Sequence, residues 1–426
     1  MNGFALGPGK SAPSCHEARR KRGLMKCFAS LCSLFLIARA AWGADDLLDE
    51  LDEALTRSFF HDQLRVRFSG MLDLEYYNFP QPPPGLIRAD GQHDLFVPRL
   101  SMFVDAKAGR AIYFFAQTRF DNGFDPSDLG WQWRLDEYAV RITPWEDGRF
   151  NLQLGKFSTV VGGWVERHLS WDNPLINAPL PYENPSLVSD LEIPLTAQSF
   201  RAVPGFDKYE FLPIIWGPVY AIGASVAGRV GMFEYAVELK NAGVSSRPES
   251  WYDYNFEDPA VGGRLSYLPN EAWRFGVSFA ENSYLVAAAR PLPSGSDHSD
   301  YRQYLFGQEI SYARGHFQIW AEVFESRFEI PRLGNADVFA YYIEAKYKIT
   351  PQLFAALRWN QEFFDSGTDS MGVSIAKAHD VSRVEAALAY RFTAHTQLKL
   401  QYSVARGNFV SNGTTGTFAA QFTVRF

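Results

Sequence analysis

The chain lacks the features that mark three common classes of protein. Its three cysteines, Cys15, Cys27 and Cys32, lie within the first 43 residues, so the rest of the chain carries no disulfide framework, cysteine-ligated zinc or thiol nucleophile. Only one apolar run approaches the ~20 residues of a transmembrane helix. Seven of the 41 basic residues and one of the 48 acidic residues also lie in those 43 positions. The remaining 34 basic and 47 acidic residues disfavour a nucleic-acid partner.

Signatures of catalysis are scarce as well. The chain contains neither H-E-x-x-H nor G-x-S-x-G. The neighbours His61 and Asp62, and His379 and Asp380, could form hydrolytic dyads, but their position in connecting segments favours solvated surface. One predicted loop holds three acids that could bind calcium without the spacing of an EF-hand, so a polar loop is favoured: Asp121, Asp125 and Asp128. We predict no catalytic residue, metal or cofactor.

The single apolar run has the layout of a secretory signal. It follows Met25 and Lys26, continues for about 11 apolar residues and ends in the small residues around Gly43. A membrane anchor is the alternative, which Arg39 disfavours because it interrupts a run that is already short. We expect residues 1–43 to be a leader with a cleaved signal peptide, complete from Met25, that exports the chain.

Aromatic residues are abundant, with 35 Phe, 20 Tyr and 11 Trp, or 15% of the chain. From about residue 63 onward, apolar residues fall on every second position in segments of about ten residues. In the last segment, Phe422, Val424 and Phe426 share one face, whereas Thr423 and Arg425 share the other. This alternation predicts β-strands with one apolar face.

The connections between these segments alternate between short and long. Seven are tight, as around Gly109 and Gly148, and eight longer ones lie between them. An up-and-down barrel of about 16 strands, with 14 to 18 allowed, has this arrangement. The parity break between Leu135 and Tyr138 predicts a β-bulge near residues 136–137. The sixteen predicted strands start near Gln63, Asp94, Ala111, Trp131, Phe150, Ile214, Val230, Ala260, Trp273, Tyr301, His316, Asp337, Gln352, Asp380, Thr396 and Thr417.

A soluble β-sandwich also alternates, but its strands are shorter and its connections lack this rhythm. A transmembrane barrel also explains the aromatic surplus, because aromatic rings gather at both membrane interfaces. The uncharged segment from Ile214 to Gly228 contains internal glycine and proline, so a strand is favoured over a helix. We predict an all-β, antiparallel, transmembrane up-and-down barrel over residues 63–426.

Two regions fall outside the barrel pattern. Residues 44–62 place Leu48, Leu51 and Leu55 at helical spacing among acids, which predicts a short amphipathic segment on the periplasmic side. The connection after the fifth strand, Ser158 to Pro213, is 56 residues long and rich in aromatics and proline. Loops of this length are usually functional or disordered, and the composition favours function.

Several of these features together resemble a known family. They are the signal peptide, the alternating strands, Phe426 after FTVR, the strand pair RLDEYAVRI and NLQLGKF, and the long loop that follows. The chain resembles Gram-negative outer-membrane porins over nearly its whole length, most nearly the phosphate-selective porin O and P group. The resemblance implies a homotrimer, a long third loop folded into the lumen, and a terminal aromatic read by the barrel-assembly machinery. The loop lacks the dense Lys and Arg of a phosphate filter, which argues against phosphate selectivity.

Charges on the polar strand face point to an aqueous lumen. We count 17 basic residues there against nine acidic ones, and a mid-strand basic residue facing lipid costs about 2–4 kcal/mol. Basic residues near turns, such as Lys107 and Arg391, have the alternative of merely lying at the rim of the barrel. For the other basic residues, the alternative is that they merely pair with acids of the lumen wall. The candidates for lining the pore or its constriction are the wall residues Arg65, Arg67, Arg99, Arg119, Arg134, Arg358, Arg383 and Lys399, and the loop acids Glu166, Asp172, Glu183, Asp190 and Glu192.

These observations predict a porin in the outer membrane of a Gram-negative bacterium. It would pass small hydrophilic solutes or ions by passive diffusion, with a weak anion preference set by the basic wall. The expected partners are outer-membrane lipid, lipopolysaccharide and the barrel-assembly machinery, with Phe426 as the assembly signal. Two alternatives remain: an outer-membrane barrel enzyme, and a plugged structural or adhesive barrel.

Overall fold

The computed structural model describes residues 45–81, 83–88, 91–122, 130–196, 210–368, 374–376, 379–407 and 413–426. No helix of these residues is both long enough and apolar enough to cross a membrane. The described elements are, in chain order, α2 (Asp45–Ala54), β1 (Thr56–Phe59), β2 (Leu64–Asn78), β3 (Asp94–Ala108), β4 (Ile112–Asp121), β5 (Gln132–Ile142), β6 (Asn151–Phe157), η1 (Trp164–Arg167), η2 (Leu180–Tyr182), β7 (Val188–Ser189), β8 (Phe211–Leu212), β9 (Ala221–Val230), β10 (Phe233–Lys240), η5 (Pro248–Tyr252), β11 (Ala260–Asn270), β12 (Trp273–Ser283), η6 (His298–Asp300), β13 (Arg302–Arg314), β14 (Phe317–Ile330), β15 (Gly334–Lys348), β16 (Leu353–Phe364), β17 (Ser366–Thr368), β18 (Ser374–Ala376), β19 (Val381–Arg391), β20 (Thr396–Arg406) and β21 (Thr414–Arg425).

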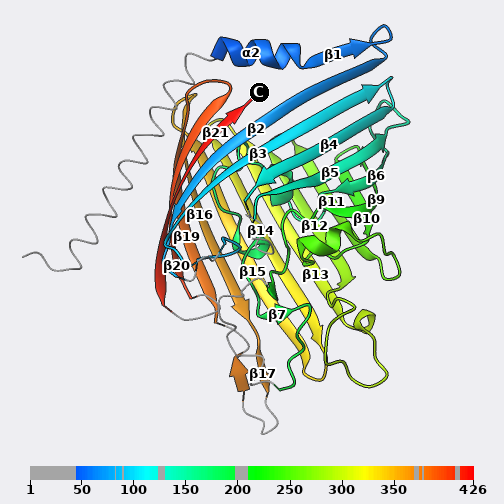
Figure 1. Ribbon diagram of the computed structural model, residues 1–426, viewed down its shortest axis with the longest axis vertical. Helices are drawn as coiled ribbons and strands as arrows, with labels where there is room; N and C mark the ends of the chain where they lie inside the picture. The colour runs from blue at the N-terminus through cyan, green and yellow to red at the C-terminus, as the bar shows by residue number, and fades with distance from the viewer. Residues whose placement is uncertain are drawn as a thin grey trace, which may run out of the picture.

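Sixteen strands among the described residues form a closed antiparallel barrel (Figure 1). Each of these strands pairs with the next one along the chain, and β21 closes the ring by pairing with Met71–Asn78 of β2. The predicted fold class and strand number are therefore confirmed. Fifteen of the predicted strand starts lie within three residues of the observed ones.

The sixth predicted strand is the exception. It was expected from Ile214, but β9 begins at Ala221. Residues Ile214 to Tyr220 instead pack inside the barrel, where Ile214 and Ile215 are fully buried. Pro213 precedes this stretch and Pro218 lies within it, and both lack the N–H group that a strand donates to its neighbour.

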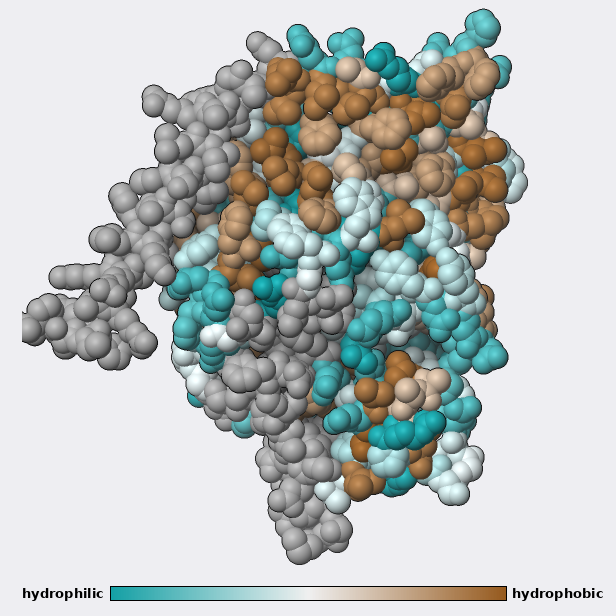
Figure 2. All heavy atoms as spheres, viewed as in Figure 1, coloured by the Kyte–Doolittle hydropathy of each residue, from teal (hydrophilic) through white to brown (hydrophobic). Residues whose placement is uncertain are grey.

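Polarity along the strands is inverted relative to a soluble protein. In β16, Leu357 and Trp359 are 56% and 44% exposed on the outer face, whereas Arg358 and Asn360 between them are completely buried inside. Figure 2 shows apolar side chains gathered over the half of the visible face nearest α2. A sandwich would bury its apolar face in a shared core, so this inversion excludes that alternative and matches a barrel in lipid.

The predicted bulge is present in β5. Gln117 of β4 pairs with Glu137, and the adjacent Thr118 pairs with Leu135, so Asp136 is the extra residue. The bulge leaves Asp136 on the inner wall, where one carboxylate oxygen lies 2.9 Å from Arg119 Nε. The parity break in the sequence thus marks a residue that contacts the lumen charges.

The two ends of the barrel differ in their connections. We call the end with short connections, such as that between β3 and β4, the turn end, and the end with long connections, such as that holding η5, the loop end. At the turn end Phe426 N donates to Gly70 O at 3.0 Å, and Gly70 N donates to Phe426 O at 2.9 Å. A Cβ atom on residue 70 would overlap the Phe426 ring, which explains the glycine. Helix α2 lies across this end (Figure 1), where Asp49 contacts His395 at 2.8 Å.

Candidate functional site

The long connection between β6 and β9 enters the barrel. Its described residues are 158–196 and 210–220, and we call residues 158–196 the lumen loop. It is the third long loop, as predicted. Thr159 Oγ1 donates to Glu238 of β10, and farther along Lys399 Nζ of β20 donates to Ser170 O at 2.7 Å. Tyr182 donates to Glu322 of β14. The loop therefore contacts wall strands on several sides of the lumen.

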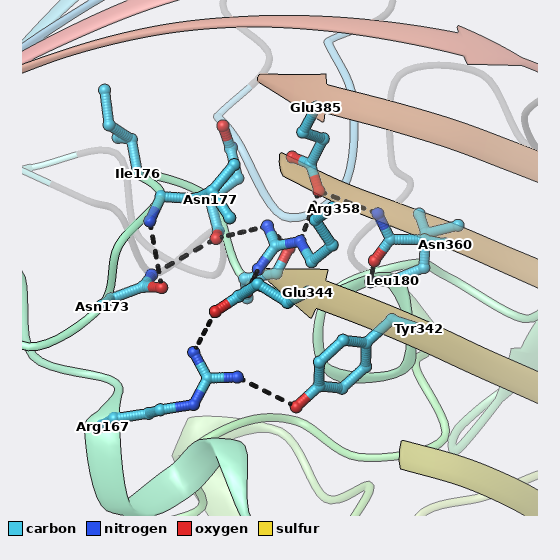
Figure 3. Close-up of polar contacts among 12 residues, drawn as sticks. Arg167, Asn173, Ile176, Asn177, Leu180, Tyr342, Glu344, Arg358, Asn360 and Glu385 are labelled. Atoms are coloured by element: carbon cyan, nitrogen blue, oxygen red, sulfur yellow. Dashed lines mark hydrogen bonds and ion pairs between the residues drawn. The ribbon is translucent and has the colours of Figure 1, made fainter. Parts of the chain in front are cut away.

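Arg358 of β16 is the central anchor of this loop (Figure 3). Its guanidinium contacts Glu344 at 3.0 Å and Glu385 at 2.6 Å, and all three side chains are fully buried. The same group donates to the backbone oxygens of Asn177 at 2.8 Å and Ala178 at 3.1 Å. One arginine therefore joins three wall strands, β15, β16 and β19, to the loop.

Two further arginines extend this contact into a chain of alternating charge. Arg383 of β19 lies 3.3 Å from Glu385 and 2.5 Å from Glu183 of the loop. At the other end Arg167 of η1 lies 2.5 Å from Glu344 (Figure 3). Three arginines and three carboxylates balance, so the buried network is held by paired, hydrogen-bonded charges.

Lys399 anchors the loop by a different chemistry. Besides Ser170 O, its ammonium donates to Asn173 O at 2.9 Å and to Leu175 O at 3.1 Å. Irregular backbone inside a barrel must have its carbonyls satisfied by other groups. The residue predicted to line the pore is therefore a buried structural contact.

A second group of charges lines the opposite wall on β3, β4 and β5. Arg119 contacts Asp121 at 3.4 Å and Asp136 at 2.9 Å, and Arg134 contacts Asp121 at 2.9 Å. Arg99 lies 3.7 Å from Asp121. The acids are 0–2% exposed at their side chains, whereas Arg99 and Arg119 are 14% and 19% exposed, so guanidinium groups form the surface and carboxylates lie behind them.

The inner wall holds acids that the sequence analysis did not assign to it, namely Asp121, Asp136 and Glu362, all buried. Asp136 is an even number of positions from Arg134, and Glu362 is an even number of positions from Arg358. The alternation of the strands could therefore have assigned both acids to the inner wall. The sequence favours a polar loop for Asp121, but this residue is the last of β4 and its buried carboxylate contacts Arg119 and Arg134. Asp125 and Asp128 lie outside the described residues. In the described part of the chain, no three His, Cys, Asp or Glu side chains are grouped to hold a metal.

The loop acids occupy different places. Glu166 lies 2.5 Å from Arg264 and 2.8 Å from Arg274. Burial would raise the pKa of Glu166, but these two arginines hold that pKa below its usual value. Asp190 pairs with Arg247 at 2.7 Å, beyond the barrel strands. The two remaining acids, Asp172 and Glu192, are exposed.

Two of the predicted wall residues lie away from the loop. Arg65 and Arg67 are exposed at the turn end, and Arg67 pairs with Asp52 of α2 at 2.9 Å. Both residues lie near the start of β2, whereas the wall residues that contact the loop lie nearer the middle of their strands.

His168 of the lumen loop is neutral. Its Nδ1 lies 2.6 Å from Val165 O, which can only accept, and its Nε2 lies 2.7 Å from the Tyr220 hydroxyl. We therefore assign the proton to Nδ1, with Nε2 accepting from Tyr220. Burial lowers the pKa of His168 to about 4, in agreement with this assignment.

Three of the hollows border the lumen loop. A turn-end hollow of about 350 Å³ is bounded by η1, Arg264 and Arg274. An inner cavity of about 130 Å³ lies between the lumen loop and strands β2–β4, and it also borders η1. A loop-end hollow of about 410 Å³ lies on the outer side of η5, whose Pro248 and Trp251 border the inner cavity. Two short 3-10 helices therefore separate the hollows.

Comparison with known proteins identifies the fold. No protein-family model and no curated protein sequence matches the chain. Solved structures that resemble it include the anion-selective porin of Comamonas acidovorans (TM-score 0.54, 11% identity, 85% of this chain and 100% of the porin). The outer membrane channel DcaP of Acinetobacter baumannii is similar (TM-score 0.54, 10% identity, 87% and 99%). So is OmpT, an outer membrane protein of Vibrio cholerae, in its trimer form (TM-score 0.53, 10% identity, 86% and 100%).

The chain thus has the barrel fold of the Gram-negative outer-membrane porins. At these identities the likeness concerns the fold alone.

Proposed function

We propose that the protein is an outer-membrane porin that lets small hydrophilic solutes or ions diffuse through its lumen. The observation that carries the proposal is the polar interior with three hollows, all of them bordered by residues of the inward-folded loop. A lumen lined by charged groups lowers the cost of moving a hydrated solute through an apolar membrane. Phosphate selectivity is not part of the proposal, because the loop lacks a dense group of Lys and Arg and its Arg167 is already paired with Glu344.

The exposed arginines favour a weak anion preference. Arg99 and Arg119 present their guanidinium groups to the inner cavity, while their partner acids lie behind them. These two exposed guanidinium groups would attract an anion, and Asp73 and Glu183 at the same cavity keep the preference weak. The reversal potential under a potassium chloride gradient measures this preference, which should fade as salt rises. A cation-selective value would contradict the basic-wall interpretation.

The same proposal includes location and partners. The leader directs export, Phe426 serves the barrel-assembly machinery, and the mature barrel assembles as a homotrimer. Acids at the loop end, including Asp253, Glu257 and Asp258, border the loop-end hollow and face the headgroups of lipopolysaccharide. Divalent cations must bridge these like charges, so the chelation of magnesium and calcium should release lipopolysaccharide.

The proposal includes no catalysis. Among the described residues, one His–Asp contact occurs at the loop end, between Asp297 and His298 at 2.6 Å. Asp297 is the N-cap of η6, accepting from the His298 backbone N–H, and Asp300 accepts from the Asp297 N–H. The pair therefore has a structural role that explains its geometry.

Liposome swelling tests the channel directly. Mature protein reconstituted into liposomes should admit a pentose faster than a trisaccharide, whereas liposomes with heat-unfolded protein should admit neither. Folding is checked on the same sample by the heat-dependent change in its gel mobility. Folded protein that admits neither sugar would favour the plugged barrel.

A further inference from the structure

The inner cavity has two chemically different sides. Its β-strand side carries hydrogen-bond donors from β3 and β4, namely Arg99, Ser101, Gln117 and Arg119. Its other side, the loop side, is made by connecting segments and is mainly apolar and aromatic, although His168, Ser170 and Glu183 also border it. That side is made by Leu86, Trp164, Ile176, Trp216, Tyr220 and Trp251.

We propose that this cavity binds small single-ring carboxylates, for which benzoate is the simplest probe, as they pass through the channel. The inference rests on the proposed function and adds a solute class to it. The ring would lie against the loop side and the carboxylate would meet the arginines.

The size of the cavity agrees with one ring. Its volume is about 130 Å³, and an engineered apolar protein cavity of about 150 Å³ binds benzene. Three of the four aromatic side chains are held by ring contacts, because Trp164 packs on Tyr182 at 4.9 Å and Tyr220 packs edge-on against Trp251 at 5.9 Å between ring centroids. Because the aromatic side chains are already in place, the binding of a planar ring costs little of their conformational entropy.

The two arginines of the cavity, Arg99 and Arg119, favour the binding of an anion. Arginine presents a planar fork of donors that matches a carboxylate. Two acids, Asp73 and Glu183, also border the cavity, but Glu183 lies 2.5 Å from Arg383 and Asp73 accepts from Thr423 at 2.6 Å. Asp73 lies opposite Arg99 across the β2–β3 pair, so its negative charge weakens the attraction of an anion to Arg99.

A further donor is available on the aromatic side. The indole N–H of Trp164 is buried and has no hydrogen-bond partner among the described residues. A carboxylate or a ring substituent could accept from it. A sugar would place hydroxyls against the aromatic side without using the arginine charge, and inorganic phosphate would leave that side without a partner.

Single-channel recording in a planar bilayer tests the proposal with the mature protein. Benzoate added to a potassium chloride solution should reduce the open current as it occupies the cavity. Acetate retains the carboxylate without the ring, and benzyl alcohol retains the ring without the charge. The concentration of each that halves the current should exceed that of benzoate at least about tenfold, which corresponds to the loss of about 1.4 kcal/mol.

Variants of the two sides locate the effect. Arg119→Lys retains the charge that Asp121 and Asp136 need but loses the fork, so benzoate should bind several-fold more weakly. Asp73→Asn removes a like charge and should strengthen binding. Arg65→Lys, at the exposed turn end, is the matched control and should change nothing.

The outcomes separate this inference from the proposed function. Potassium chloride currents that benzoate leaves unchanged would overturn the inference while the channel stands. Equal block of the current by benzoate and acetate would overturn the inference that the aromatic side chains of the cavity bind the ring. Folded protein without any current would instead contradict the channel itself.

Discussion

Replacing Arg358 by Met should loosen the lumen loop. The substitution retains apolar volume but removes the partner that Glu344 and Glu385 share, and the carbonyls of Asn177 and Ala178 each lose one of their donors. Arg358, Glu344 and Glu385 are completely buried. Removing one partner from a buried ion pair costs about 3–5 kcal/mol. We therefore expect the free energy of unfolding to fall by that amount, and the channel current to become larger and noisier.

Urea unfolding in lipid vesicles, followed by tryptophan fluorescence, measures the first effect, and bilayer recording measures the second. Arg65→Met is the control, since that residue is exposed at the turn end and its replacement should cost less than about 0.5 kcal/mol. Without Arg358, Glu385 shares Arg383 with Glu183, so the network has one buried negative charge in excess. Adding Glu385→Gln to the Arg358→Met variant removes that excess charge and should restore part of the stability. An Arg358→Met protein that unfolds and conducts like the parent would refute the anchor.

Three other predictions follow from the same contacts. Deleting Phe426, or replacing Gly70 by Val, removes or displaces the ring that closes the barrel, so surface levels in cells should drop; normal levels would contradict this. The lowered pKa of Glu166 means that its charge, and the loop contact with Arg264 and Arg274, persist at neutral pH and disappear only as pH falls through a value below 4.5. Anion preference should then rise below pH 4.5 in the parent but not in Glu166→Gln, and a rise already complete above pH 4.5 would assign it to another group. Chelation of divalent cations should release lipopolysaccharide from the purified protein, and retention after chelation would argue against cation bridges.

Alternation of apolar and polar residues was enough to predict the barrel. Strand period and the short-long rhythm of the turns are local properties, so they specified the strand number and even the bulge at Asp136. The start of β9 could not be read in this way. The stretch from Ile214 is apolar because it packs in the lumen, and an apolar run looks the same whether lipid or a loop covers it.

The site was predictable only in part. Parity placed Arg358, Arg383 and Lys399 on the inner wall, but not their partners, which are loop groups about 180 to 230 positions away in the sequence. The inward loop followed from its length and from the resemblance to porins. Whether a wall arginine faces solute or holds the loop depends on that long-range contact.

The central claim is that the lumen remains open past its inward loop, and single-channel recording of the unaltered mature protein tests it most directly. Insertion into a planar bilayer at about 1 M potassium chloride, where surface charges are screened within about 3 Å, should give discrete and uniform current steps. The same folded preparation should give none after heat unfolding. Folded, inserted protein without steps would contradict the account and identify the loop as a plug.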